Sequence, residues 1–129
     1  MDCTDVITFL PTADLERADD FYRGKLGLPL AVDQGRCRIY RVGANAYLGL
    51  CRATPGRAPC SPGVIITFVT DDVQARHAEL RGRGVTFESA PERNLEYNIT
   101  HCFLRDPDGH LLEIQRFEHP QWQPGNRDS

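Results

Sequence analysis

The sequence has almost no lysine, no long apolar run and no marked excess of charge of either sign. Lys25 is the only lysine, and 15 basic residues face 18 acidic residues, which leaves a formal net charge of −3. Such a small and mixed charge is not that of a nucleic-acid-binding protein or of a protein held electrostatically on a membrane. No apolar run approaches the roughly 20 residues needed to span a bilayer. We therefore expect neither a nucleic-acid nor a membrane partner.

The cysteines also lack a pattern. There are five of them, and they contain no C-x-x-C pair: Cys3, Cys37, Cys51, Cys60 and Cys102. The acidic stretch at residues 1–5 has neither the basic nor the apolar region of a signal peptide. Cysteines of a protein without an export signal are usually reduced thiols. We predict a cytoplasmic protein with free thiols.

The first half of the chain predicts a strand, a helix and three further strands. Thr12 or Asp14 can cap the helix, an apolar stripe from Leu15 to Leu26 forms one side of it, and Gly27 ends it. Turn-forming residues separate the later strands. The expected strands are Val6–Pro11, Leu28–Val32, Cys37–Val42 and Ala46–Arg52.

A linker rich in proline and glycine, residues 53–63, leads to a second half with the same order of elements. Asp71 or Asp72 can cap the second helix, which Gly82 and Gly84 close. The polar stretch 89–98 is expected to be a loop. The expected strands are Val64–Thr70, Val85–Glu88, Ile99–Arg105 and His110–Phe117.

The two halves are an internal repeat. Shifted by 58 positions, Val6, Ile7, Thr12 and Asp14 coincide with Val64, Ile65, Thr70 and Asp72. One β-α-β-β-β module leaves a sheet face uncovered, so two modules are expected to pair. We predict an α+β fold, with the modules forming an incomplete barrel around a groove. Residues 1–129 are then one domain: module one at 5–52, the linker at 53–63, module two at 64–117 and a loose tail at 118–129.

The last hairpin places one carboxylate, Glu113, among apolar strand residues. Asp106–Gly109 has the composition of a tight turn. A symmetric four-residue loop would set Cys102 opposite Glu113, and His101 would then face the helix unless a bulge brought it round to Glu113. Glu113 either faces solvent or points into a cavity, where it would need a metal, a hydrogen-bond donor or a ligand.

Three motifs resemble those of a known superfamily. They are T-x-D-L-E-R-A-x-x-F-Y-x-x-x-L-G-L at 12–28, T-D-D-V at 70–73 and D-P-D-G-x-x-x-E at 106–113. Over residues 5–117 the chain resembles the vicinal oxygen chelate superfamily. That superfamily includes glyoxalase I, extradiol dioxygenases, fosfomycin-resistance enzymes, and bleomycin- and mitomycin-binding resistance proteins. The resemblance implies the fold more specifically than the activity.

The resemblance also implies four metal-ligand positions, one on the first and one on the last strand of each module. In this chain those positions hold Ile7, Gly49, Ile65 and Glu113. Three of the four have no donor atom, and a lone carboxylate does not retain a divalent metal. We therefore predict no metal and no cofactor.

These expectations together favour a binding protein. It would sequester an apolar, aromatic natural product without metal, as antibiotic self-resistance proteins do, and would form a homodimer. The alternative is a lyase, isomerase or dioxygenase of the same superfamily with a rearranged or absent metal site. No residue is assigned a catalytic role. The expected ligand-binding residues are Glu113, Ile7, Phe9, Tyr47, Gly49, Ile65, Thr67, His101, Cys102 and Trp122.

Overall fold

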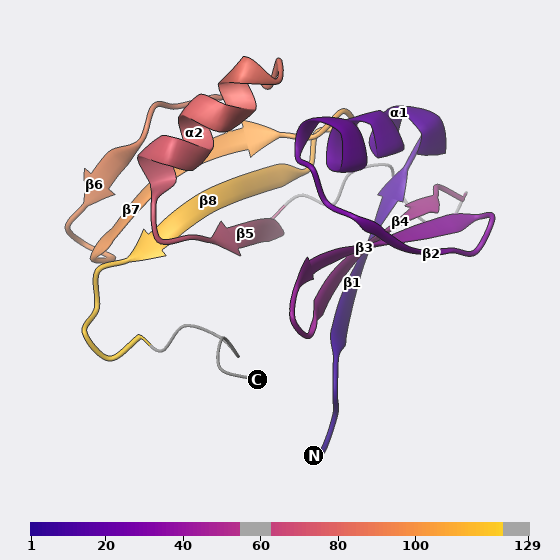
Figure 1. Ribbon diagram of the computed structural model, residues 1–129, viewed down its shortest axis with the longest axis horizontal. Coiled ribbons are helices and arrows are strands. Elements are labelled where there is room, and N and C mark those ends of the chain that lie inside the picture. Colours follow the sequence, from indigo (N-terminus) through magenta and orange to yellow (C-terminus); the bar gives the residue numbers. More distant parts are fainter. Residues whose placement is uncertain (55–62, 123–129) are drawn as a thin grey trace. The chain divides into compact units, whose positions relative to one another are not determined.

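The computed structural model describes residues 1–54 and 63–122, which divide into two compact units (Figure 1). The first unit runs from Met1 to Pro62 and includes the short segment Pro107–Gly109. The second comprises Gly63–Asp106 and His110–Ser129. Most of the expected linker and the end of the expected tail lie outside the described residues.

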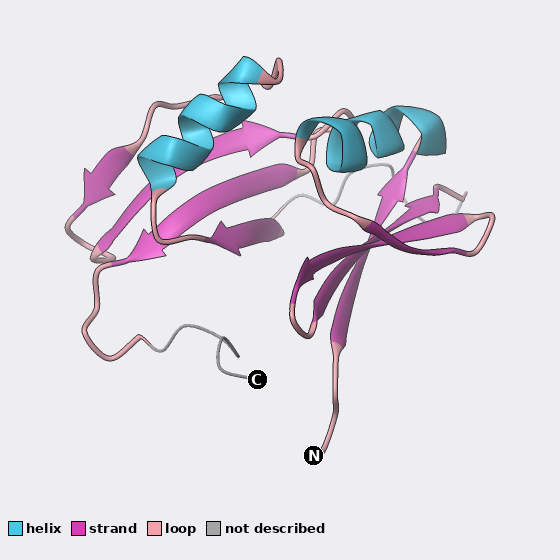
Figure 2. Ribbon diagram, viewed as in Figure 1, coloured by secondary structure: helices cyan, strands magenta, loops and turns pink. Residues whose placement is uncertain are grey.

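The first unit is a four-stranded mixed sheet with a short helical segment. The sheet order is β1-β4-β3-β2, in which β1 and β4 are parallel and the other neighbours antiparallel (Figure 2). Its elements are β1 (Val6–Thr12), α1 (Leu15–Asp19), η1 (Asp20–Lys25), β2 (Leu30–Asp33), β3 (Cys37–Gly43) and β4 (Ala46–Arg52).

The helical segment of the first unit follows the predicted stripe but changes geometry midway. The side chain of Asp14 accepts a hydrogen bond from Arg17 N at 3.1 Å, as an N-cap does. From Asp20 the α-helix continues as the π-helical η1, with Leu26 N donating to Phe21 O. Gly27 follows with φ 74°, the left-handed conformation expected of a terminating glycine.

The second unit repeats this arrangement. The strand order β5-β8-β7-β6 matches that of the first sheet, with β5 parallel to β8. Its elements are β5 (Ile65–Val69), α2 (Val73–Gly82), β6 (Glu92–Asn94), β7 (Ile99–Arg105) and β8 (Leu111–Phe117). Two open sheets with short helices confirm the prediction of an α+β fold.

Two local predictions in the second unit are wrong. The stretch Val85–Glu88 is not a strand and forms a single bridge, between Phe87 and Leu104. Conversely, β6 lies within the stretch expected to be a loop, where Glu92, Arg93 and Asn94 pair with β7. A three-residue strand of polar residues has no alternating apolar pattern, so the sequence gives no signal for it.

Each sheet has one face packed into a small core. In the second unit α2 lies across β7 and β8 (Figure 1), and four strand side chains on the packed face are at most 4% exposed: Cys102, Leu104, Leu112 and Ile114. In the first unit Tyr40, Leu48 and Leu50 are equally buried, and α1 contacts β3 and β4. Within the described residues, no helix is long and apolar enough to cross a membrane.

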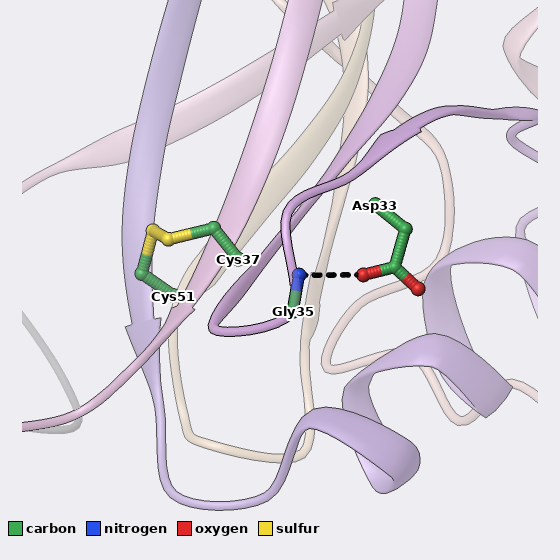
Figure 3. Close-up of a disulfide and its surroundings, with 4 residues drawn as sticks. All are labelled: Asp33, Gly35, Cys37 and Cys51. Atoms are coloured by element: carbon green, nitrogen blue, oxygen red, sulfur yellow. Dashed lines mark hydrogen bonds between the residues drawn. A yellow bond between two sulfur atoms is a disulfide. The ribbon is translucent and has the colours of Figure 1, made fainter.

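A disulfide joins β3 to β4, so the prediction of reduced thiols is wrong for this pair. Cys37 and Cys51 are directly opposite in the antiparallel register, with Cα atoms 4.1 Å apart (Figure 3). At the β2–β3 turn nearby, Asp33 Oδ1 accepts a hydrogen bond from Gly35 N at 2.8 Å. Cys3 and Cys102 are free thiols. The Cys37–Cys51 pairing can be predicted from the sequence only if the register of the two strands is known.

Candidate functional site

The register of the β7–β8 hairpin determines which side chains accompany Glu113. Glu113 lies opposite Phe103, and Cys102 lies opposite Ile114, one residue away from the expected pairing. The cause is the turn, in which Asp106 N donates to His110 O at 3.1 Å, so that Pro107–Gly109 form a three-residue loop. Gly109 has φ 90°, the left-handed conformation that such loops require.

A shift of one residue moves every β7 side chain to the other face of the sheet. Cys102, expected opposite Glu113, is therefore on the other face, and that expectation is wrong. Cys102 is fully buried, and burial raises the pKa of its thiol to about 11, with a further contribution from the Glu113 charge. A thiol in this state is neither a ligand contact on the Glu113 side nor a nucleophile.

The same shift places the His101 side chain beside Glu113. Its Nδ1 lies 2.6 Å from Glu113 Oε2, and Thr67 Oγ1 donates to Glu113 Oε1 at 2.7 Å. The side chains of His101 and Glu113 are 9% and 10% exposed. Three adjacent strands thus supply one hydrogen-bonded cluster, because Thr67 on β5 pairs with Glu113 on β8. No bulge is needed to bring His101 to this side.

Apolar side chains and Gln115 flank the cluster on the same sheet face, which we call the Glu113 face. Strand alternation places Ile65 and Val69 there, on either side of Thr67, and each is 48% exposed. The rings of His101 and Phe103 meet edge to face with centroids 5.0 Å apart. Further along β8, Phe117 stacks on Trp122 at 4.1 Å between centroids. Phe103 and Phe117 were absent from the expected set, although the alternation from Glu113 to Phe117 points to the second of them.

The expected residues of module one share a face of the first sheet. Ile7 pairs with Tyr47 and Phe9 with Gly49, and both Ile7 and Phe9 are 42% exposed. The Phe9 ring lies directly against Gly49, where an added Cβ would be 2.4 Å from Phe9 Cδ1. Any larger residue at position 49 would therefore have to displace the Phe9 ring. Tyr47 Oη accepts from Arg41 Nη2 at 3.1 Å.

The four positions that the resemblance links to metal binding differ sharply in chemistry. Only Glu113 offers a donor atom, and both of its oxygens are already engaged by Thr67 and His101. Ile7, Gly49 and Ile65 have none. Metal coordination needs several converging N or O donors, and three of these four positions supply none.

Comparison with known proteins gives a consistent result. Residues 5–114 match the family model of the Glyoxalase/Bleomycin resistance protein/Dioxygenase superfamily. The uncharacterized protein YraH of Bacillus subtilis (strain 168) is 24% identical over 117 residues, covering 80% of this chain and 90% of YraH.

Solved structures of similar proteins agree. A glyoxalase/bleomycin resistance protein/dioxygenase from Nocardioides has a TM-score of 0.76 at 24% identity, covering 98% of this chain and 90% of its own. A glyoxalase/bleomycin resistance protein from Streptomyces sp. CB03234 has a TM-score of 0.67 at 29% identity, covering 85% of this chain and 97% of its own.

Proposed function

Because the chain belongs to the Glyoxalase/Bleomycin resistance protein/Dioxygenase superfamily, we propose that it is a binding protein for an organic small molecule. It sequesters an apolar, aromatic natural product on the Glu113 face, without metal, in the manner of an antibiotic-resistance protein. The observation that supports this most is the Thr67–Glu113–His101 cluster, in which Glu113 and His101 are buried, on a face with half-exposed apolar residues. A few polar groups among apolar ones are typical of small-molecule sites.

The same geometry argues against the enzymatic alternatives. A lyase or dioxygenase of this superfamily needs a metal held by several side chains, and three of the four carried-over positions lack donor atoms. An isomerase with Glu113 as its base needs a carboxylate that the substrate can reach, whereas this side chain is only 10% exposed and each oxygen already has a hydrogen-bond partner. Binding therefore remains the better-supported function.

A thermal-shift screen of aromatic natural products, run with chelator present, tests the proposal. Hits should raise the melting temperature of the wild type, because a ligand that binds only the native state stabilises it. Ile65→Glu should abolish the shift by placing a charge on the Glu113 face. Val64→Glu is the matched control, since Val64 is 46% exposed and precedes β5, pointing away from that face. Equal loss of the shift in both variants, or shifts that require added metal, would contradict the proposal.

We also propose that the protein forms a homodimer. Large apolar side chains on β1 are exposed in the single chain, with Val6 at 61% and Ile7 and Phe9 at 42%. Exposed apolar patches commonly mark interaction sites, and two-fold dimers are the commonest closed assembly. Sedimentation at micromolar concentration should give twice the mass of the chain, and a monomer mass would refute this part.

A cytoplasmic location stays a prediction. The Cys37–Cys51 disulfide does not support it, because disulfides are rare in cytosolic proteins. Fractionation of cells that produce the protein from its own gene tests the location directly.

A further inference from the structure

Each oxygen of Glu113 already has one partner within the cluster, and the second ring nitrogen of His101 is the polar atom that the cluster leaves unengaged. Oε1 accepts from the Thr67 hydroxyl and Oε2 faces His101 Nδ1. A carboxylate only accepts hydrogen bonds, so Nδ1 bears the hydrogen in this contact. In a neutral imidazole, the other nitrogen, Nε2, is then a bare acceptor.

Nε2 of His101 is available for such a contact. Among the described residues, the only hydrogen-bond partner of the His101 side chain is Glu113. In the part of the chain that the structure describes, the buried side-chain nitrogens without a hydrogen-bond partner are Arg38 Nε and His119 Nδ1, and His101 Nε2 is not one of them. It therefore reaches solvent, although most of the ring around it is buried.

The ring itself is held in place. Its edge-to-face contact with Phe103 and its short bond to Glu113 fix the ring from two sides. Thr67 in turn holds the carboxylate, with Ile65 and Val69 on either side along β5. The Nε2 acceptor thus opens on a face where Ile65 and Val69 lie beside Gln115, the cross-strand neighbour of His101, in an orientation that packing and hydrogen bonds predetermine.

Building on the proposed function, we propose that the site selects aromatic ligands whose hydroxyl group donates a hydrogen bond to His101 Nε2. Glu113 is the positioning residue, because it determines which imidazole nitrogen bears the hydrogen. A ligand with an ether or carbonyl oxygen at that point would place its oxygen lone pair against the lone pair of His101 Nε2. Both acceptors would then be desolvated without a donor, which disfavours such ligands.

The tautomer can be measured without any ligand. Side-chain ¹⁵N NMR of the labelled protein at about pH 8, above the ordinary histidine pKa, should show hydrogen on Nδ1 of His101 and none on Nε2. The His101→Asn variant identifies the signal among the four histidines. In Glu113→Gln the amide can donate to Nδ1, so the Nε2–H tautomer should become populated. Hydrogen on Nε2 in the wild type would overturn the assignment.

Selectivity is tested with 2-naphthol, whose hydroxyl group donates a hydrogen bond, and 2-methoxynaphthalene, in which a methyl group replaces the hydroxyl hydrogen. By fluorescence titration, the wild type should bind 2-naphthol about tenfold or more tightly than the ether. In His101→Asn the amide nitrogen can still donate to Glu113 but Nε2 is gone, so the preference should disappear. Glu113→Gln should reduce it, which a merely structural residue would not do.

The outcomes separate the two proposals. Equal binding of both naphthalenes by the wild type overturns the selectivity of His101 and leaves small-molecule binding intact. Failure of both to bind at millimolar concentration contradicts the proposed function as well, because the Glu113 face would then not accept an aromatic molecule.

Discussion

Removing the Asp108 side chain should destabilise the protein far more than its place in a surface turn suggests. Asp108 lies in the segment Pro107–Gly109, which belongs to the first unit. Its carboxylate accepts from Thr12 Oγ1 at 2.5 Å, Ala13 N at 2.9 Å and Arg17 Nη2 at 3.0 Å. The side chain is only 1% exposed, so it is a buried carboxylate at the start of α1.

The size of the destabilisation in Asp108→Ala depends on whether each hydrogen-bond partner of the lost carboxylate finds another partner. Arg17 is 49% exposed and regains water, so that ion pair contributes little. Ala13 is also an exposed residue, so its amide can regain a water partner. Thr12 is fully buried and loses its 2.5 Å bond to the carboxylate, although its hydroxyl can still donate to Asp14 O at 3.2 Å. A hydrogen bond to a charged group contributes about 1.5–3 kcal/mol. With the lost charge-assisted bonds, we expect the free energy of unfolding to fall by about 2–3 kcal/mol.

Urea denaturation measures this loss directly. Asp108→Asn keeps one carbonyl acceptor and should lose only about 1 kcal/mol. Glu88→Ala is the control, because Glu88 makes a 2.8 Å ion pair with Arg105 in which both side chains are nearly half exposed, and its loss should cost under about 0.5 kcal/mol. A value for Asp108→Ala equal to that of the control would refute the reasoning.

Three further results are expected. Reducing the Cys37–Cys51 disulfide, which spans 14 positions, should lower the unfolding free energy by up to about 3 kcal/mol, and an unchanged urea midpoint would contradict this. The Arg23 hydrogen bond lowers the pKa of Asp19. The wild type should therefore have a higher unfolding free energy than Asp19→Asn at neutral pH, and this difference should shrink below about pH 4. A difference independent of pH would contradict this. Purified protein should contain well under one equivalent of metal, with a melting temperature unaffected by chelator.

The elements were predictable from the sequence more readily than their pairing. The strands Ala46–Arg52 and Ile99–Arg105 have the predicted bounds, because apolar runs between turn residues define both ends. Register depends instead on whether the turn has three or four residues, and Asp106–Gly109 is compatible with either. The disulfide between Cys37 and Cys51 was not predictable for the same reason, because recognising the pair requires knowledge of the β3–β4 register.

The site was predictable in its central residue but not in its chemistry. Glu113 stood out as a carboxylate among apolar residues, and Thr67 was among the expected ligand-binding residues. The role of His101 depended on the single-residue register shift set by Gly109. The change from α-helix to π-helix at Asp20 was likewise not predictable, because it depends on local backbone hydrogen bonds and an apolar stripe is compatible with either helix.

Methyl NMR of the protein with a hit from the ligand screen tests the central claim most directly. Ile65 and Ile66 are neighbours on β5 whose side chains lie on opposite faces of the sheet. With chelator present, the ligand should shift the Ile65 methyl signal and leave those of Ile66 and Ile114 in place. Shifts confined to Ile66 and Ile114, or shifts that appear only when metal is added, would contradict metal-free binding on the Glu113 face.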